Sequence, residues 1–463
     1  MRAQFRQGTL AFGPQHPAAH GILKLQMQLH GEVLRWVDPQ FGYLHRGTEK
    51  LMEARNCLQS LPYFDRFDYV ANLFQEHAFC LAVEALYGLP SHLTTGVQLA
   101  RVLFDEISRI LNHLLTLSAT ALDLSAMGPI FWAFEERESL MELCEQASGA
   151  RMHTAMYRPF AFDFTVLSGV FIRELGQFLS RCGRSLAGAF LGLLNNRSLK
   201  SRLSFVGQIS LAKAEAYGIT GLTARSCGSL YDLRLQGRAG YTIYRGLAFR
   251  VFLGRRGDNF DRFLLRVKEV AECFRLLSQC VQALQPAPAA GLRALVSGVV
   301  IQAAACHRLG AWGVGVRPMA GLATLGRAFG RAYSTGLPGA RCAPNRAYPQ
   351  GSLAGVLPPL QWLEPTRALA KFTGMEALIS HFRGASEGWP LAHGFTYGSV
   401  ESPKGEVGVT LVGAGGAKPY RAKVRTPVSH NMHLIPLLSV GATFADFVAT
   451  FCSLDIVMGE IDR

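Results

Sequence analysis

Residues 98–122 read QLARVLFDEISRILNHLLTLSATAL, and the pattern in this stretch indicates the fold class. Its apolar residues recur every three or four positions, which places them in one stripe along an α-helix. The stripe consists of Val102, Leu103, Ile107, Ile110, Leu111, Leu114 and Leu115. Long helices with such a stripe pack side by side, so we predict a helical bundle in the middle of the chain.

The neighbouring segments extend this bundle. A helix is predicted over residues 65–88, where apolar side chains recur at helical spacing up to Gly88. Another helix is predicted over residues 134–148, and Gly149 directly after it is expected to terminate it. Residues 208–262 are mixed in pattern and rich in turns. We therefore expect residues 63–280 to form a helical bundle with a mixed region.

Residues 1–62 are predicted to form a small antiparallel β unit. Apolar and polar residues alternate from Leu23 to His30, as they do in a strand with one buried face. Gly31-Glu32 then forms a turn into a second strand over residues 33–37. A short helix is expected over residues 50–58.

The loop of this β unit, FGPQHPAAHG at residues 12–21, carries two histidines, His16 and His20. Their spacing of four would place both on one face of a helix, but Pro14 and Pro17 argue against a helix here. A zinc site of the HExxH type is excluded because the helix and the glutamate are both missing. From the residues alone, the loop is either a structured turn or a site for proton transfer.

Residues 281–363 differ in composition from the rest of the chain. They contain seven arginines but no lysine, aspartate or glutamate. We interpret this segment as an insertion, with a helix over residues 292–308, that covers a surface or faces a partner. Binding of nucleic acid or lipid headgroups is the alternative.

Residues 364–463 are predicted to be a compact α+β segment. A helix is expected over residues 368–382, followed by strands over residues 395–401, 408–412 and 419–423. The predicted fold class of the whole chain is therefore α+β.

The composition restricts the class of protein. The net charge is +14, which favours binding to nucleic acid, to anionic lipid or to acidic neighbouring subunits. The mean hydropathy is +0.16, but no apolar run is long enough for a transmembrane helix, so extra apolar surface is expected to pack against other subunits. The ten cysteines include no CxxC pair, which excludes the usual zinc and iron–sulfur patterns and predicts no metal bound by this chain.

Nine motifs, taken together, resemble the quinone-site subunit of respiratory complex I, which is also called NADH dehydrogenase subunit seven. The motifs are FGPQHPAAHG (12–21), GYLHRGTEKLME (42–53), LPYFDRFDYV (61–70), RVLFDEISRILNH (101–113), ALDLSAMGPIFWAFEERESLME (121–142), SGARMH (148–153), GRRGDNFDRFLLRVKE (254–269), ESPKGEVGVTLV (401–412) and LDIVMGEIDR (454–463). The resemblance runs from about residue 9 to the last residue and is interrupted at 281–363.

This family is related to the large subunit of nickel–iron hydrogenases, which hold their metals with paired CxxC motifs near both ends. Here residues 42–47 and 458–463 contain no cysteine. The groups present cannot replace soft thiolate ligands, so hydrogenase activity is rejected. The resemblance implies a hydrogenase-like fold whose emptied cavity binds the headgroup of ubiquinone.

The resemblance also implies roles for single residues. His20 and Tyr69 would donate hydrogen bonds to the quinone, and Asp123 would orient His20 and stabilise its charge. The competing interpretations are a turn histidine, a core tyrosine and a helix-end carboxylate. Proton loss at His20 would start the coupling to proton pumping. Electrons would come from a 4Fe–4S cluster of the adjacent subunit, because this chain binds no cofactor.

Three further residues, Arg46, Arg66 and His153, match family positions beside the partner's cluster. Cationic donors there would raise the reduction potential of the cluster. For Arg66 an ion pair at a helix start is the competing interpretation. His16 and His45 receive no role. After Arg158 and Pro159 the family usually has two glycines, whereas this chain has Phe160 and Ala161, so no residue is assigned up to about residue 205.

The implied partners are other complex I subunits, above all the adjacent iron–sulfur subunit and the membrane-arm subunit at the quinone channel. The implied location is the peripheral arm on the matrix side of the mitochondrial inner membrane, or the cytoplasmic side of a bacterial plasma membrane. Three alternatives compete: a hydrogenase-type metalloenzyme, a nucleic-acid-binding protein and a structural subunit with an inactive pocket. The missing CxxC pairs disfavour the first, and the scattered basic residues disfavour the second.

Overall fold

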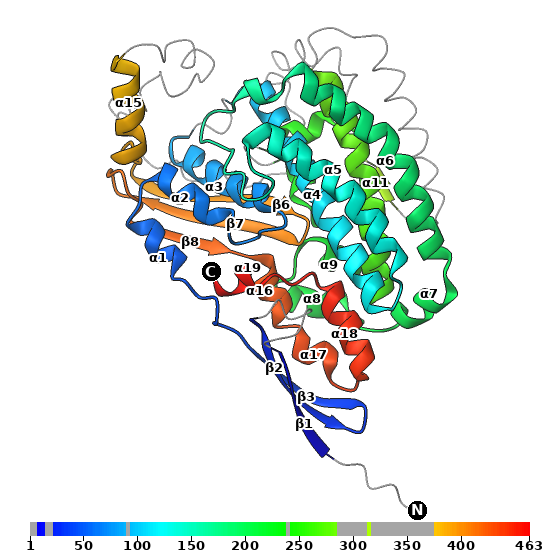
Figure 1. Cartoon of the computed structure of the whole chain (residues 1–463). Helices are drawn as coiled ribbons and strands as arrows, with labels where there is room; N and C mark the ends of the chain where they lie inside the picture. The colour runs from blue at the N-terminus through cyan, green and yellow to red at the C-terminus, as the bar shows by residue number, and fades with distance from the viewer. Residues whose placement is uncertain (1–6, 14–21, 89–92, 238–240, 285–312, 316–374) are drawn as a thin grey trace, which may run out of the picture.

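The structure is a computed structural model that describes residues 7–13, 22–88, 93–237, 241–284, 313–315 and 375–463. Long helices lie side by side on one side of the molecule, and a three-stranded sheet lies next to them (Figure 1). The helices are α4 (Thr95–Asp123), α5 (Gly128–Ser148), α6 (Gly169–Asn195) and α11 (Asn259–Leu284). The α+β fold class is confirmed.

Helix α4 lies at the centre of the bundle, where it packs against α5 and α11, and α6 packs against α5 and α11 in turn. Every residue of the apolar stripe predicted for α4 is buried except Leu115, which is half-buried. Thr94 begins the helix, because its side-chain oxygen accepts a hydrogen bond from the amide of Val97. The predicted helix over 98–122 is confirmed.

The sheet beside the bundle is antiparallel and consists of β6 (Gly394–Ser402), β7 (Gly405–Gly413) and β8 (Arg421–Arg425) in that order. It confirms the three strands predicted near the C-terminus. Helix α3 (Asn72–Leu86) packs on β6 and β7. The approach is so close that a Cβ at Gly398 would lie 2.5 Å from the main-chain nitrogen of Ala82, which explains the glycine there.

The N-terminal sheet is also antiparallel and consists of β1 (Gln7–Phe12), β2 (Lys24–His30) and β3 (Val33–Gln40). The alternating pattern predicted this unit correctly, since Leu23, Leu25 and Met27 are buried. Their buried face belongs to the same apolar core as α17 (Ile435–Ser439) and α18 (Phe444–Ser453). The first strands of the chain therefore share a core with helices close to its end.

Two predicted helix boundaries were wrong. The helix expected over 50–58 is split into α1 (Thr48–Glu53) and α2 (Cys57–Phe64), because the side chain of Asn56 accepts from the amide of Gln59 at 2.9 Å and starts a new helix. The helix expected from residue 65 begins only at Asn72. The residues before it are held in a loop by the Asp68 carboxylate, which accepts from the amides of Val70 and Ala71.

Other boundaries shift by less. Helix α5 begins at Gly128 rather than at residue 134, and Gly149 ends it with φ 79°, as predicted. Helix α11 continues past residue 281 to Leu284, so regular structure extends into the segment interpreted as an insertion. The helix predicted over 292–308 lies outside the described residues. Helix α15 (Met375–Ser386) overlaps the helix predicted over 368–382, whose first residues are also outside them.

Short elements make up the remainder, and the turn-rich pattern of 208–262 is confirmed. They are α7 (Arg197–Leu203), α8 (Leu211–Ala216), α9 (Gly221–Ser226), α10 (Leu233–Gln236), β4 (Arg250–Phe252), β5 (Gly313–Gly315), α16 (Pro427–Met432), α19 (Met458–Asp462) and the 3₁₀ turns η3 (Phe164–Val166) and η4 (Thr242–Gly246). Within the described ranges, the structure contains no helix with the length and apolar character needed to cross a membrane.

Candidate quinone and cluster site

Tyr69 lies in the loop that joins α2 to α3, and it is half-buried. The loop is held in place by the preceding residue, Asp68, whose carboxylate accepts from Lys404 Nζ at 2.6 Å. Burial raises the pKa of Tyr69, and the negative charge of Asp68 raises it further, while Lys404 opposes the shift. The phenol therefore stays protonated at neutral pH and is able to donate a hydrogen bond.

Asp123 is exposed and forms the last residue of α4. Its Oδ2 accepts a hydrogen bond from the thiol of Cys452 on α18. Burial raises the pKa of this thiol well above its usual range, and the Asp123 charge adds to the effect, so Cys452 stays a neutral donor. His20, the predicted partner of Asp123, lies outside the described residues, so the His20–Asp123 pair stays a prediction.

Arg46, Arg66 and His153 come together at one short stretch of main chain. Arg46 Nη2 donates to the carbonyl of Arg66 at 3.2 Å, and His153 Nδ1 donates to the carbonyl of Asp65 at 3.2 Å. Arg66 Nη1 donates to the Pro62 carbonyl at 2.6 Å in the last turn of α2. The structure thus brings together the three residues that are predicted to lie beside the iron–sulfur cluster of the partner subunit. Arg66 stabilises a helix end rather than a helix start.

The main chain is strained at this point. His153 has φ 56° and Ala155 has φ 40°, both in the left-handed region that side chains with a Cβ rarely adopt. The Asp65 carboxylate holds the strained segment, because its Oδ2 accepts from the Ala155 amide at 2.8 Å. Strained backbone of this kind is concentrated at functional sites, where the surrounding structure holds it in place.

Residues 42–47 and 458–463, the two segments without cysteine that were compared with the hydrogenase motifs, also meet. Asp462 in the last helix accepts from the main-chain amides of Gly42 at 2.9 Å and of Leu44 at 2.7 Å. His45 Nδ1 donates to the Asp462 carbonyl at 2.6 Å. The resemblance gave these segments a common site, and the fold brings them into contact although they lie at opposite ends of the chain.

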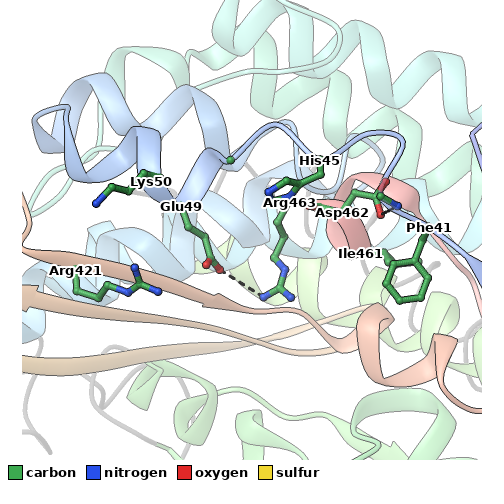
Figure 2. Close-up of a pocket in the computed structure, with 10 residues that line it drawn as sticks. Phe41, His45, Glu49, Lys50, Arg421, Ile461, Asp462 and Arg463 are labelled. Atoms are coloured by element: carbon green, nitrogen blue, oxygen red, sulfur yellow. Dashed lines mark hydrogen bonds and ion pairs between the residues drawn. The ribbon is translucent and has the colours of Figure 1, made fainter.

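A cavity of about 490 Å³ opens between these segments (Figure 2). Charged side chains of both signs surround it, namely Glu49, Lys50, Arg421, Asp462 and Arg463. Arg463 Nη1 lies 3.4 Å from Glu49 Oε1 across it. Neither Tyr69 nor Asp123 is among the described residues that line it.

No metal site is evident in the described part of the chain, where no three or more His, Cys, Asp or Glu side chains are grouped so as to hold an ion. The residues around Tyr69 and Asp123 offer hydrogen bonds and charges instead. Groups of this kind are able to take part in proton transfer.

Comparisons with known proteins agree with the motifs. Residues 123–308 and 347–463 match the family model described as respiratory-chain NADH dehydrogenase, 49 Kd subunit. The chain belongs to this family. The break in the match, at residues 309–346, falls inside the segment interpreted as an insertion.

Relatives from this family align over nearly the whole chain. The NADH-ubiquinone oxidoreductase 49 kDa subunit of Paramecium tetraurelia is 39% identical over 98% of this chain and 98% of its own length. An NADH-quinone oxidoreductase subunit of the bacterium Chelativorans sp. is 38% identical over 99% of this chain and 98% of its own. The 49 kDa subunit of Cafeteria roenbergensis is 37% identical over 99% and 98%. The relatives thus include both eukaryotic and bacterial proteins.

Several residues near Tyr69 received no role from the sequence. They are Gln75, Asn112, Lys404, Asp455 and Glu460, which are linked to Asp68 or to one another. Four of them lie within the quoted motifs, which was the available signal. Spacing along the chain did not reveal them, because they come from segments that are far apart in sequence.

Proposed function

We propose that the chain is a core subunit of a respiratory NADH–quinone oxidoreductase, and that it forms the quinone-reduction site together with a neighbouring iron–sulfur subunit. The full-length match to the 49 kDa family carries this proposal. Electrons reach the site from NADH through the cluster chain of other subunits. This chain contributes the pocket, the proton donors and the coupling to proton translocation.

In this proposal His20 and Tyr69 donate hydrogen bonds to the two oxygens of the quinone headgroup. Reduction places negative charge on these oxygens, and donors held in position stabilise that charge. Tyr69 is suited to the role because its hydroxyl stays protonated and its loop is anchored through Asp68. Asp123 would stabilise the charged form of His20, and proton loss at His20 would change this pair and start the coupling to the proton pumps.

Arg46, Arg66 and His153 would lie beside the 4Fe–4S cluster of the adjacent subunit. Positive charge and hydrogen-bond donors stabilise the reduced cluster, which carries the more negative charge. The contacts of all three residues with the 62–66 segment support a common role. The site would sit near the membrane-arm subunit at the quinone channel, on the matrix side of the mitochondrial inner membrane or the cytoplasmic side of a bacterial membrane.

The experiment is the variant Tyr69→Phe in the assembled complex. Phenylalanine keeps the ring but removes the hydroxyl donor, so NADH oxidation with ubiquinone is expected to fall about a hundredfold. NADH oxidation with ferricyanide should not change, because that acceptor does not need the quinone site. Tyr217→Phe, at a tyrosine that is 40% exposed on the surface, is the matched control.

The second candidate is a structural subunit with an inactive pocket. It predicts that Tyr69→Phe and the control have equal quinone-dependent activity in fully assembled complexes. Equal activities would therefore reject the proposed site.

A further inference from the structure

A cluster of mostly buried polar side chains includes Asp68, the residue that precedes Tyr69. Its members are Asp68, Gln75, Asn112, Lys404, Asp455 and Glu460. They come from the α2–α3 loop, α3, α4, the β6–β7 turn, the segment after α18, and α19. Asp68, Gln75, Asn112 and Glu460 are all 0% exposed, so water does not screen their charges and dipoles.

Lys404 is the cation at the centre of the cluster. Its Nζ donates to Asp68 Oδ2 and to Asn112 Oδ1, both at 2.6 Å. Asn112 Nδ2 in turn donates to Asp455 Oδ2 at 2.6 Å. The ammonium is therefore shared by one carboxylate and one amide, and it does not pair directly with Glu460 among the described contacts.

The charges of the cluster do not balance if every carboxyl is ionised. Asp68 is stabilised by Lys404 and two main-chain amides, and Asp455 is stabilised by Asn112, by Lys404 and by the charge of Arg266. Glu460 has less support, because only a main-chain hydrogen bond at Val428 and the charge of Lys404 favour its ionised form, and it forms no ion pair among the described residues. Its Oε1 accepts from Gln75 Nε2 at 2.6 Å, whereas its Oε2 has no hydrogen-bond partner among the described residues.

A buried carboxylate without a direct ion pair is costly, so Glu460 is the member that holds a proton. Burial raises the pKa of Glu460 to about 8, and the negative charges of Asp68 and Asp455 contribute, while Lys404 opposes the shift. A carboxyl in this pH range can both give up and regain a proton near neutrality.

Glu460 and Tyr69 share the same charged neighbours. Asp68, Lys404 and Asp455 act on the pKa of both groups. Asp68 also directly precedes Tyr69 in the chain and fixes its loop. A change of charge at Tyr69 therefore alters the electrostatic potential at Glu460 through the Asp68–Lys404 pair.

We propose that Glu460 stores the proton that replaces the one Tyr69 gives to its substrate. The inference rests on the proposed function. In this step the Glu460 O–H bond breaks and the O–H bond of Tyr69 forms again, so Tyr69 returns from phenolate to phenol while Glu460 becomes a carboxylate. Total charge is unchanged, and Glu460 then takes a proton from water.

The first test is an infrared pH titration of the assembled complex in its resting state. The wild type is expected to show a protonated-carboxyl C=O band that disappears with a midpoint near pH 8. Glu460→Gln should lose this band, because the amide keeps the shape and the Gln75 contact but carries no titrating proton. The matched control is Glu272→Gln, a 3% exposed glutamate on α11 outside the cluster, which should keep the band.

The second test is turnover with ubiquinone as a function of pH. Glu460→Gln should lower the rate about tenfold and increase the solvent deuterium isotope effect, because reprotonation becomes the slow step. Glu460→Asp should restore part of the rate with a shifted pH profile. It also serves as the second variant if glutamine prevents assembly, which a native gel reveals.

The outcomes separate the two proposals. If the band is absent in the wild type, or if Glu460→Gln keeps the wild-type pH profile and isotope effect, the proton store is rejected. If either of these results is found while Tyr69→Phe still abolishes quinone turnover, only the proton store at Glu460 is rejected. If Tyr69→Phe is fully active, the proposed function fails.

Discussion

At the scale of single residues, the position of Asp123 at the end of a helix does not stabilise its negative charge. It ends α4, where the helix dipole is negative and disfavours a carboxylate. Asp123→Asn is expected to lower quinone-dependent NADH oxidation about tenfold, because a neutral amide does not stabilise an imidazolium. Oxidation of NADH by ferricyanide in the assembled complex should stay at the wild-type level.

Cys452→Ser is the matched control for this variant. Serine keeps a donor for Asp123, so its turnover should be close to that of the wild type. If Asp123→Asn is as active as Cys452→Ser, the carboxylate has no role in the site.

Glu460 also makes stability depend on pH. Its pKa is about 8 in the folded chain against an ordinary value of 4.5, so the folded state binds a proton that the unfolded state has released. The contribution of Glu460 to the free energy of unfolding is fully present below pH 4.5. It is lost as the pH rises to about 8, and the free energy of unfolding then falls by about 1.4 kcal/mol per pH unit.

Glu460→Gln removes this dependence. Thermal unfolding of the assembled complex should therefore show the variant gaining stability relative to the wild type between about pH 6 and about pH 8. A constant difference between the two proteins across that range would contradict the buried, protonated state of Glu460.

At the scale of elements, Phe160 shows how a local conformation is held by its surroundings. It occupies φ 67°, and its amide donates to Glu84 Oε1 at 2.7 Å. Its ring packs edge-on against Tyr87, with centroids 5.3 Å apart. Position 160 thus combines a backbone conformation that glycine adopts freely with a large apolar side chain.

Replacement of Phe160 by alanine or glycine removes the ring and should cost about 3–5 kcal/mol of unfolding free energy in both cases. Glycine adopts φ 67° without strain, so Phe160→Gly should be about 1 kcal/mol more stable than Phe160→Ala. Elsewhere alanine is normally the more stable of the two. Thermal unfolding of the two variants side by side measures the difference, and an alanine variant that is the more stable would show that the strain is absent.

At the scale of the whole molecule, Arg225 joins segments from across the chain. Its guanidinium is fully buried and donates to Asp232 Oδ2 at 3.2 Å, Glu401 Oε1 at 2.6 Å and Glu269 Oε1 at 2.8 Å. These partners precede α10, lie on β6 and lie on α11, so the pairs tie the bundle to the sheet. Removal of the cation leaves three carboxylates buried without it.

Arg225→Met is therefore expected to cost about 3–5 kcal/mol of unfolding free energy and to lower the amount of assembled complex. Arg275→Met is the control, because Arg275 forms its ion pair with Glu272 at a partly exposed position and should contribute about 1 kcal/mol or less. The comparison is made on the melting temperatures of the two variants, and equal values would mean that Arg225 does not connect the two parts.

Much of the fold was predictable because it depends on local patterns. The stripe on α4 and the alternation in β2 reflect which face of an element meets the core, and this information is contained in a few consecutive residues. The late start of α3 at Asn72 was not predicted. Its cause is the side chain of Asp68 competing for main-chain amides, which apolar spacing does not reveal.

The candidate site was predictable only in part. The roles of His20, Tyr69 and Asp123 came from the resemblance of motifs, since a loop histidine, a tyrosine and an acid have no chemistry evident from spacing alone. The gathering of Arg46, Arg66 and His153 at residues 62–66 agrees with that resemblance. Cys452 as the partner of Asp123 was missed, because a lone cysteine in an apolar helix normally indicates core packing.

By itself, the sequence determined the α+β class, most helices and strands, the absence of CxxC pairs and the family. Only the tertiary structure decided that Asp68, Asn112, Lys404, Asp455 and Glu460 come together in one mostly buried cluster that includes the residue before Tyr69. The physical reason is that the spacing of apolar residues along the chain indicates only which face of a helix or strand is buried. The charge state of a buried carboxyl depends instead on the few ions that the fold places around it, and these ions come from distant parts of the chain.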